Sequence, residues 1–385
     1  MLLALASAAA TAQTHKSDPT RAPAPQGFLA KFRDPEDGRL DASAWLLDHR
    51  GALPVPILIT EPAVDYGGGV ALLFFRRPEG AAQTWTNANG VQRPIAPDIY
   101  GAFGARTRNG TKAWGGGASM HFRDDRWRYV GGVAQPDIHL DYYLPARDGG
   151  TRRIAYAIDG LGSMQQVQRR IGNRDLYVGL RWVYLDFDAR LDVESDSDAF
   201  DPRDFKQRNS GLGATLEYDV RDNPFTPSSG WIGGVDATVY ATSLGGDRNY
   251  STVRGRVFAY TPVAHDRVVL AGRVDVRAAY GDVPFYVQPF VELRGVPAAR
   301  YQDTRTAVLE GEVRWNVTPR WAAVGFAGVG RAWGHSAFDD AATPVTKGVG
   351  GRYLVARRLG LYAGVDYAWG PEDGAVYIQV GGAWR

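Results

Sequence analysis

One arginine and two glutamates are the sequence's clearest candidates for buried polar chemistry. Arg294 and Gly295 lie in a loop rich in Gly, Pro and Gln, and Glu310 and Glu312 follow it in the chain. Glutamates two residues apart on a strand share one face, so either carboxylate can point inward from the following strand. A guanidinium shielded from water needs such a partner, and a bidentate pair would fix the loop in place. The competing interpretation is a set of unrelated surface charges.

Catalytic and metal-binding arrangements are less evident. The chain contains no G-x-S-x-G, H-E-x-x-H, phosphate-binding P-loop or C-x-x-C motif. Ser119 and His121 lie two residues apart and could serve a barrel that modifies lipids, but ordinary polar residues facing a wet interior explain them better. The acidic stretch at residues 192–201 could attract divalent cations, although a solvated loop accounts for it more simply. We therefore predict no enzymatic activity, no cofactor and no metal site.

Strands must position the arginine and the glutamates. Before the loop, Leu270, Val274 and Val276 alternate with Arg273, Asp275 and Arg277, and after it Leu309, Val313 and Trp315 alternate with Glu310, Glu312 and Arg314. A period of two predicts strands with one apolar and one polar face. The polar faces of neighbouring strands carry charges of both signs, which favours an enclosed wet interior and an apolar exterior. That is the pattern of a transmembrane β-barrel.

Similar stretches recur along the chain from Leu53 onward. We predict strands at 54–60, 66–75, 98–107, 111–123, 126–142, 152–167, 176–190, 210–220, 230–242, 250–261, 268–280, 306–317, 321–333, 346–355, 360–368 and 375–384. About 16 strands is an even number, as single-chain barrels require. The predicted fold class is therefore all-β, a transmembrane antiparallel β-barrel of about 16 strands with a short N-terminal periplasmic segment.

The connections between these strands alternate in length. Short turns with longer loops between them are typical of barrels with short periplasmic turns and longer extracellular loops. This alternation places both chain ends in the periplasm. The polar loop at residues 76–97 falls on the short-turn side and fits that pattern poorly.

Composition narrows the function classes. The 385 residues include 47 Gly, 19 Tyr and 11 Trp but no Cys, and the net charge is +2. The absence of Cys excludes a disulfide scaffold, and the near-neutral charge offers no basic stripe for nucleic acid. The aromatic content suits interfacial girdles. No stretch approaches the roughly 20 apolar residues of a membrane-spanning helix.

The two ends of the chain suggest how it is divided. Residues 1–12 are apolar and end in Ala10-Thr11-Ala12, which predicts the remnant of a secretory signal peptide; an ordinary disordered N-terminus is the alternative. Residues 13–53 would be a periplasmic N-terminal segment, and residues 54–385 the barrel. The last predicted strand, which we extend to Trp384, must pair with the first to close the barrel.

Three stretches carry motifs. They are Tyr218-Asp-Val-Arg-Asp-Asn-Pro-Phe-Thr-Pro-Ser-Ser-Gly230, Leu293-Arg294-Gly295 with Glu310-Gly311-Glu312-Val313-Arg314-Trp315, and Gly350-Gly351-Arg352-Tyr353-Leu354 through Asp366-Tyr367-Ala368. Together they resemble the BamA/TamA superfamily of outer-membrane assembly barrels, the bacterial surface antigen proteins. The resemblance is good from about Asn209 onward and weaker before it.

The resemblance implies roles for particular residues. It implies a 16-stranded barrel whose sixth long loop folds into the lumen, where its arginine pairs with acidic groups on the wall. By position, Arg294 and Gly295 are the loop-six motif, Glu310 and Glu312 are its lumen partners, and Asp222, Asn223, Pro224 and Gly230 form a periplasmic turn motif. Three features depart from the family pattern. Gly328 stands where a second acidic partner is expected, Val296-Pro297 replaces the aromatic residue after Arg-Gly, and the closing strand ends in Trp384-Arg385 and not in a terminal aromatic residue. These departures bear on the loop-six lock and on any insertase activity.

The predicted function follows from this resemblance. We predict a protein of the bacterial outer membrane that assists insertion or transport of proteins or lipids; the alternative is a passive pore or structural barrel without insertase activity. Residues 13–53 are too few to hold the periplasmic POTRA modules of assembly proteins, which predicts a barrel-only member. The expected partners are outer-membrane lipid and a periplasmic protein that supplies the missing modules, but no nucleic acid.

Overall fold

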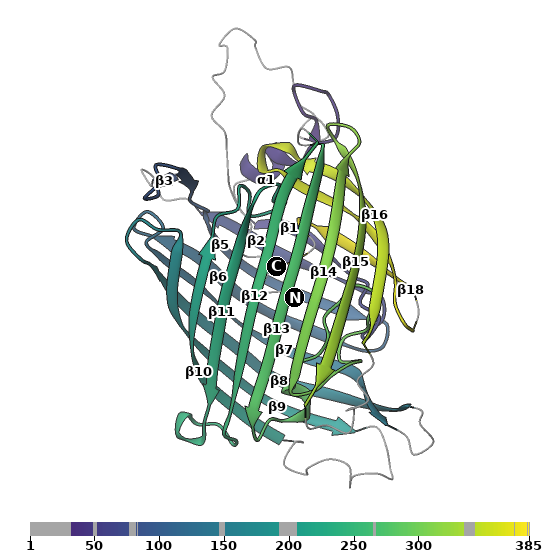
Figure 1. Ribbon diagram of the computed structural model, residues 1–385. Coiled ribbons are helices and arrows are strands. Elements are labelled where there is room, and N and C mark those ends of the chain that lie inside the picture. Colours follow the sequence, from purple (N-terminus) through teal and green to yellow (C-terminus); the bar gives the residue numbers. More distant parts are fainter. Residues whose placement is uncertain are drawn as a thin grey trace.

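A single large antiparallel sheet, curled into a nearly closed barrel, makes up most of the protein (Figure 1). The structure is a computed structural model that describes residues 32–48, 52–76, 82, 84–145, 151–191, 206–264, 267–334, 343–372, 374–382 and 384. The sheet has 16 strands, and their spatial order follows the chain from β1 to β18. This confirms the predicted all-β barrel. The predicted signal-peptide remnant and the acidic stretch at 192–201 lie outside the described residues.

The barrel strands are β1 Ala52–Ile59, β2 Gly67–Arg76, β5 Asp98–Thr107, β6 Lys112–Phe122, β7 Trp127–Pro145, β8 Thr151–Arg170, β9 Leu176–Leu191, β10 Lys206–Asp219, β11 Gly230–Tyr240, β12 Tyr250–Val263, β13 Val268–Gly281, β14 Arg305–Asn316, β15 Trp321–Trp333, β16 Val345–Ala356, β17 Leu361–Trp369 and β18 Gly374–Val380. One helix, α1 Ser43–Asp48, precedes them. Among the described residues, no helix is long and apolar enough to cross a membrane.

The two faces of the sheet have opposite chemistry. On β13 and β14 the outward residues are apolar, and Leu309 is 57% exposed. The inward residues Arg273, Asp275 and Glu310 are almost fully buried. Arg254 of β12 pairs with Asp275 across the inner wall at 2.6 Å. A buried charge requires a partner of this kind, so the ionic side chains belong to the interior and the apolar side chains face lipid.

The two ends of the barrel differ in their connections. One end, the short-turn end, carries the turns at residues 123–126, 171–175, 317–320 and 357–360, and α1 lies against it (Figure 1). The opposite end, the long-loop end, carries the connection at residues 282–304, which is the sixth at this end and is called loop six below. The rule that periplasmic turns are short predicts that the short-turn end faces the periplasm.

The connection at residues 76–97 also lies at the short-turn end and is not the simple polar loop that the sequence predicted. It contains a small hairpin, β3 Thr84–Thr86 and β4 Gln92–Pro94. Asp175 on the β8–β9 turn accepts hydrogen bonds from Asn87 and Arg93, each at 2.8 Å. The hairpin therefore folds onto a neighbouring turn, which explains why this end tolerates an insertion.

The sheet has two edges, formed by β1 and β18. Over the described residues, no strand ladder joins them. Pro54 and Pro56 lie in β1, whose pairing with β2 is continuous. Proline lacks an N–H and is tolerated at a strand edge, so β1 has few donors to offer to β18. We call the line between β1 and β18 the seam.

Candidate functional site

Loop six crosses the lumen from one wall to another. It leaves β13 and returns to β14, yet its short helix η6, Phe285–Val287, reaches β8. Phe285 packs there with Ile154, Tyr156 and Ile158, and its ring meets Tyr156 edge-on at 5.4 Å. The Gln302 side chain donates to the Phe285 and Gln288 carbonyls at 2.5 and 3.0 Å, which holds the turn together.

Arg294 anchors the returning half of loop six. Its Nε donates to Glu310 at 2.7 Å, and its Nη1 lies 2.8 Å from Glu312 and 2.9 Å from Asp366. The guanidinium also stacks 3.5 Å above the Phe326 ring. Glu310 is 1% exposed and Arg294 7% exposed, so water competes little for these bonds. The structure thus brings Arg294 together with both glutamates singled out from the sequence.

Asp366 is the partner that sequence reasoning missed. It lies on β17, three strands beyond Glu310, and Arg352 of β16 donates to its two oxygens at 2.5 and 2.8 Å. The second acidic partner expected at position 328 therefore comes from another strand. A signal was present: Asp366 alternates with the exposed Val365 and Tyr367, which places it on the inner face.

Gly328 gives space instead of charge. A Cβ at this position would lie 2.8 Å from the Leu293 Cδ2 and 3.1 Å from the Glu310 Cγ. Leu293 and Val291 pack inward against β14 and β15 because Gly328 and Gly330 leave room for them. This departure from the family pattern therefore admits the loop into the lumen.

Gly295 makes the turn that follows Arg294. Its φ of 93° lies in the left-handed region, where glycine carries no penalty. Its N–H donates to the Tyr377 hydroxyl of β18 at 2.9 Å. Loop six thereby reaches the last strand of the sheet.

The predicted periplasmic turn motif folds across the short-turn end. The Asn223 side chain caps its own turn, accepting from the Phe225 and Thr226 N–H groups, and donates to the Leu359 carbonyl at 3.0 Å. Phe225 is buried against Leu359 and Ile99. The turn at residues 220–229 therefore links β10 and β11 to strands near both sheet edges.

The other members of the motif shape that turn. Asp222 accepts the N–H groups of Ser228 and Ser229 at 2.9 and 3.1 Å. Gly230 has a φ of 89°, and a Cβ there would collide with the Val220 carbonyl. Pro224 lies between these capping residues.

The last strand is shorter than predicted and does not include Trp384. β18 ends at Val380, and Gly381, with a φ of 88°, turns the chain inward. The Trp384 indole is buried in the lumen, where it donates to Glu310 at 2.7 Å and packs near Phe258 and Tyr260. Trp384 therefore does not lie on the strand that borders the seam. Its polar N–H needs a buried acceptor, and the inner face of β14 supplies one.

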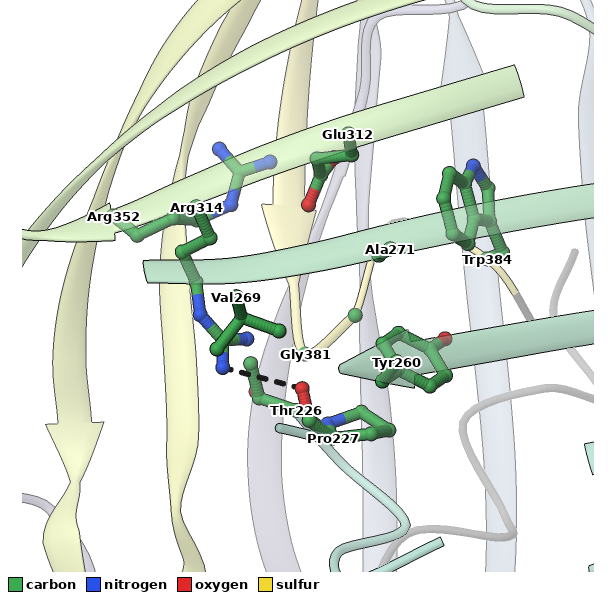
Figure 2. Close-up of a pocket in the computed structure, with 11 residues that line it drawn as sticks. Thr226, Pro227, Tyr260, Val269, Ala271, Glu312, Arg314, Arg352, Gly381 and Trp384 are labelled. Carbon is green, nitrogen blue, oxygen red and sulfur yellow. Dashed lines mark hydrogen bonds between the residues drawn. The ribbon is translucent and has the colours of Figure 1, made fainter. Parts of the chain in front are cut away.

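Figure 2 shows a small pocket between the inner wall, the turn at residues 220–229 and the segment that follows β18. Arg314 of β14 points toward the turn at residues 220–229 and donates to the Pro227 carbonyl at 3.2 Å (Figure 2). Glu312, Tyr260 and Trp384 surround the same space. The short-turn half of the lumen is thus occupied by two chain segments.

An ionic clamp holds the N-terminal segment to the short-turn end. Arg320, only 1% exposed, pairs with Asp34, with Asp37 at 2.7 Å and with Asp41 at 2.6 Å. Hydrogen bonds from Arg320 hold the pKa of Asp37 below its ordinary value. Burial alone would raise the pKa of Asp41, but hydrogen bonds from Ser43 and Arg320 outweigh it, so this pKa also lies below its ordinary value. The sequence alone offers no means of finding this contact, since Arg320 and Asp41 lie 279 residues apart.

Ser119 and His121 show no catalytic arrangement. Both lie on β6, and no hydrogen bond joins them among the described side chains. The His121 backbone N–H donates to Asp98 at 2.9 Å, while the imidazole lies 3.9 Å from Asp125. Nor does any group of three acidic or His side chains within the described ranges form a metal site.

Comparisons with known proteins find a family domain in part of the chain. Residues 118–291 match the Omp85 superfamily domain. The fold resembles BamA from Haemophilus ducreyi lacking POTRA domains 1–3, with a TM-score of 0.59 and 10% identity over 86% of this chain and 70% of that one. It also resembles CdiB from Escherichia coli, with a TM-score of 0.58 and 13% identity over 85% of this chain and 61% of that one.

CdiB from Acinetobacter baumannii has a TM-score of 0.54 and 11% identity, over 86% of this chain and 59% of that one. The chain therefore spans less than two thirds of each CdiB chain, and at such identities the likeness concerns the fold alone. No curated protein sequence matches the chain. The domain match and the 16-stranded barrel together confirm the predicted resemblance: residues 118–291 carry the match to the Omp85 superfamily domain, and the chain forms a β-barrel of the bacterial outer membrane.

Proposed function

We propose that this barrel assists the insertion or passage of a protein or a lipid at the outer membrane, and that the substrate uses the seam. The observation that carries the proposal is the occupied lumen. Loop six crosses it from β14 to β8, and the turn at residues 220–229 occupies its short-turn half together with Gly381, Gly382 and Trp384. A route along the barrel axis would have to displace all three segments. Omp85 superfamily members are transporters and insertases rather than enzymes, and we infer the same of this chain.

The seam offers the alternative route. β18 has 7 residues and β1 has 8, whereas β7 and β8 have 19 and 20. Pairing energy grows with the number of ladder bonds. Over the described residues no ladder joins β1 to β18, whereas a ladder joins every neighbouring pair within the sheet, so the two edges separate at lower cost than the interior pairs. The two prolines of β1 lower that cost further. A separated seam would present both strand edges to a substrate within the membrane.

Disulfides across the seam test this proposal. The chain has no native Cys, so cysteines scanned along β1 and β18 can be oxidised without background. In proteoliposomes, the reduced protein should accelerate insertion of an unfolded client barrel, followed by its heat-modifiable gel migration. Oxidation should abolish the acceleration, and reduction should restore it.

A matched control uses the paired residues Pro54 and Leu72 of β1 and β2. Cysteines at these two positions cross-link an interior ladder, and oxidation there should leave client insertion intact. Insertion that persists with a fully cross-linked seam would rule out the seam route.

A structural barrel without insertase activity is the second candidate, because a filled lumen also suits it. It predicts neither client acceleration nor ion conductance in planar bilayers. A passive pore predicts steady conductance instead. The occupied lumen favours the structural barrel over the pore.

We also infer how the chain meets its surroundings. The signal-peptide remnant at residues 1–12 would direct export, and residues 13–53 would stay in the periplasm, where the clamp at Arg320 holds residues 34–41. Outer-membrane lipid would surround the apolar belt. A periplasmic protein that supplies POTRA-like modules would meet the short-turn end, and co-purification from membranes would identify it.

A further inference from the structure

The tip of loop six lies where the first and last hairpins of the sheet approach each other. Gly295 contacts β18 through the Tyr377 hydroxyl, as described above. Further along loop six, Arg300 and Tyr301 pair with Glu372 of the β17–β18 turn, at 3.0 and 2.6 Å. Together with the Arg294–Asp366 bond, these contacts tie loop six firmly to the last two strands.

The same tip also holds the first hairpin. Between the two groups of contacts, the Ala298 N–H donates to the Glu61 carboxylate at 3.0 Å. Glu61 lies on the turn between β1 and β2, and the same oxygen accepts the Ala63 N–H of its own turn at 3.4 Å. Loop six therefore contacts the chain on both sides of the seam.

The Glu61 bond is made in a partly desolvated setting. Burial raises the pKa of Glu61 above its ordinary value, against the opposing effect of its two N–H donors. A hydrogen bond to a charged acceptor in such a setting is stronger than one made in water. It bridges residues 237 positions apart in the chain, whereas the Ala63 bond only shapes the local turn.

Loop six makes more contacts with the last strands than with the first hairpin. Loop six is bound to β14, β17 and β18 by a buried arginine network that does not cross the seam. When the first hairpin moves away from β18, that network can stay intact. The bond between Ala298 and Glu61 has to break.

We propose that Glu61 is the latch by which loop six holds the seam closed, and that its release permits the first hairpin to separate. The proposed function supplies only the reason for the seam to open. The latch itself depends on the contacts at the seam, whatever substrate passes through it. Loop six travels with the last strands when the seam opens. The first hairpin is the moving part.

Spin labels across the seam provide the test. In a Leu58→Cys/Ile378→Cys background, both labels occupy outward positions on the edge strands, and their distance distribution separates closed from open molecules in proteoliposomes. Glu61→Ala should raise the ratio of open to closed molecules about tenfold, which corresponds to loss of a hydrogen bond to a charged group. Glu61→Gln keeps an oxygen acceptor and should raise the ratio less.

The matched control is Asp65→Asn. Asp65 lies on the same turn with a φ of 65°, and it accepts only a local bond from the Tyr66 N–H among its described contacts. Asparagine tolerates that backbone region, so this variant removes a charge without removing the latch. It should leave the ratio unchanged. Equal ratios for Glu61→Ala and Asp65→Asn would overturn the proposal.

A second pair of variants replaces the latch covalently. Ala63 and Ala298 donate to one oxygen, so both backbones approach the same point, and we choose this pair for a trial disulfide. In a Glu61→Ala chain labelled at the seam through non-thiol chemistry, oxidised Ala63→Cys/Ala298→Cys should restore the closed ratio, and reduction should abolish it. An open population unaffected by this disulfide would equally refute the latch.

The client assay separates the two proposals. If Glu61→Ala opens the seam while client insertion does not respond, the latch stands and the proposed function fails. If seam disulfides abolish insertion while Glu61→Ala leaves the distance distribution unchanged, the function stands and the latch fails.

Discussion

Substituting Arg294 by Ala should release loop six from the lumen wall while leaving the barrel folded. Removing one member of a buried ion pair typically costs about 3–5 kcal/mol. Here two of the three carboxylates keep another donor: Asp366 retains Arg352, and Glu310 retains the Trp384 indole. We therefore expect the lower half of that range, about 3–4 kcal/mol, which is roughly a hundred- to a thousandfold change in the local opening equilibrium.

Amide hydrogen exchange at the loop tip measures this equilibrium directly. The Gly295 N–H is held by Tyr377, so its protection reports whether the tip is docked. The strand ladders between β13 and β14 do not depend on Arg294, so their amides should remain protected. Arg294→Lys keeps the charge but loses the planar fork and should fall between Ala and wild type.

Arg181→Ala is the control. Arg181 also faces the lumen, but it donates to Gln166 and Asp236 on the wall formed by β8 and β11. Its loss disturbs a lumen ion pair elsewhere and should leave exchange at Gly295 unchanged. If Arg294→Ala and Arg181→Ala gave the same wild-type protection at Gly295, the anchoring role of Arg294 would be refuted.

Three further outcomes are expected. Arg320→Ala should free residues 32–48 from the short-turn end, which limited proteolysis detects. Acid should do the same in wild type, because the pKa of Asp41 is lowered in the folded protein. The stability that Asp41 contributes to the clamp is present above the ordinary carboxyl pKa and is lost as the pH falls through the folded-state pKa. Gly328→Asp, which restores the acidic residue of the family pattern, should loosen loop six and speed exchange at its tip, because the new Cβ would meet the Leu293 side chain at a cost of about 1–3 kcal/mol. Trp384→Phe keeps the aromatic packing but removes the indole donor, and should lower stability in denaturant by about 1–3 kcal/mol, since a buried carboxylate loses a hydrogen bond.

Each of these has a contradicting result. Proteolysis that is unchanged in Arg320→Ala, or release in wild type well above the ordinary carboxyl range, would contradict the clamp. Slower exchange in Gly328→Asp would mean that the extra carboxylate tightens the lock. A denaturation midpoint in Trp384→Phe equal to that of wild type would show that the indole donor adds no stability.

Local pattern determined much of the fold. Residues on a strand alternate between two faces whatever lies far away, so the alternation around Arg273 and Glu310 sufficed to predict an inside-out barrel, and the count of such stretches gave its 16 strands. The same alternation indicated that Glu310 and Glu312 face inward. These are properties of neighbouring residues, and a sequence displays them directly.

Tertiary structure decided which inward residues meet. Asp366 compensates for Gly328 from a strand 38 positions later, because barrel curvature brings the inner face of β17 toward loop six. Trp384 turns into the lumen because an indole N–H finds a buried carboxylate there, and a pattern of apolar residues cannot reveal that acceptor. Likewise, the Arg320 clamp and the Glu61 bond join segments more than 230 residues apart. Periodicity records the face on which a side chain lies, whereas the partner across an enclosed space is fixed only when all the strands have closed around it.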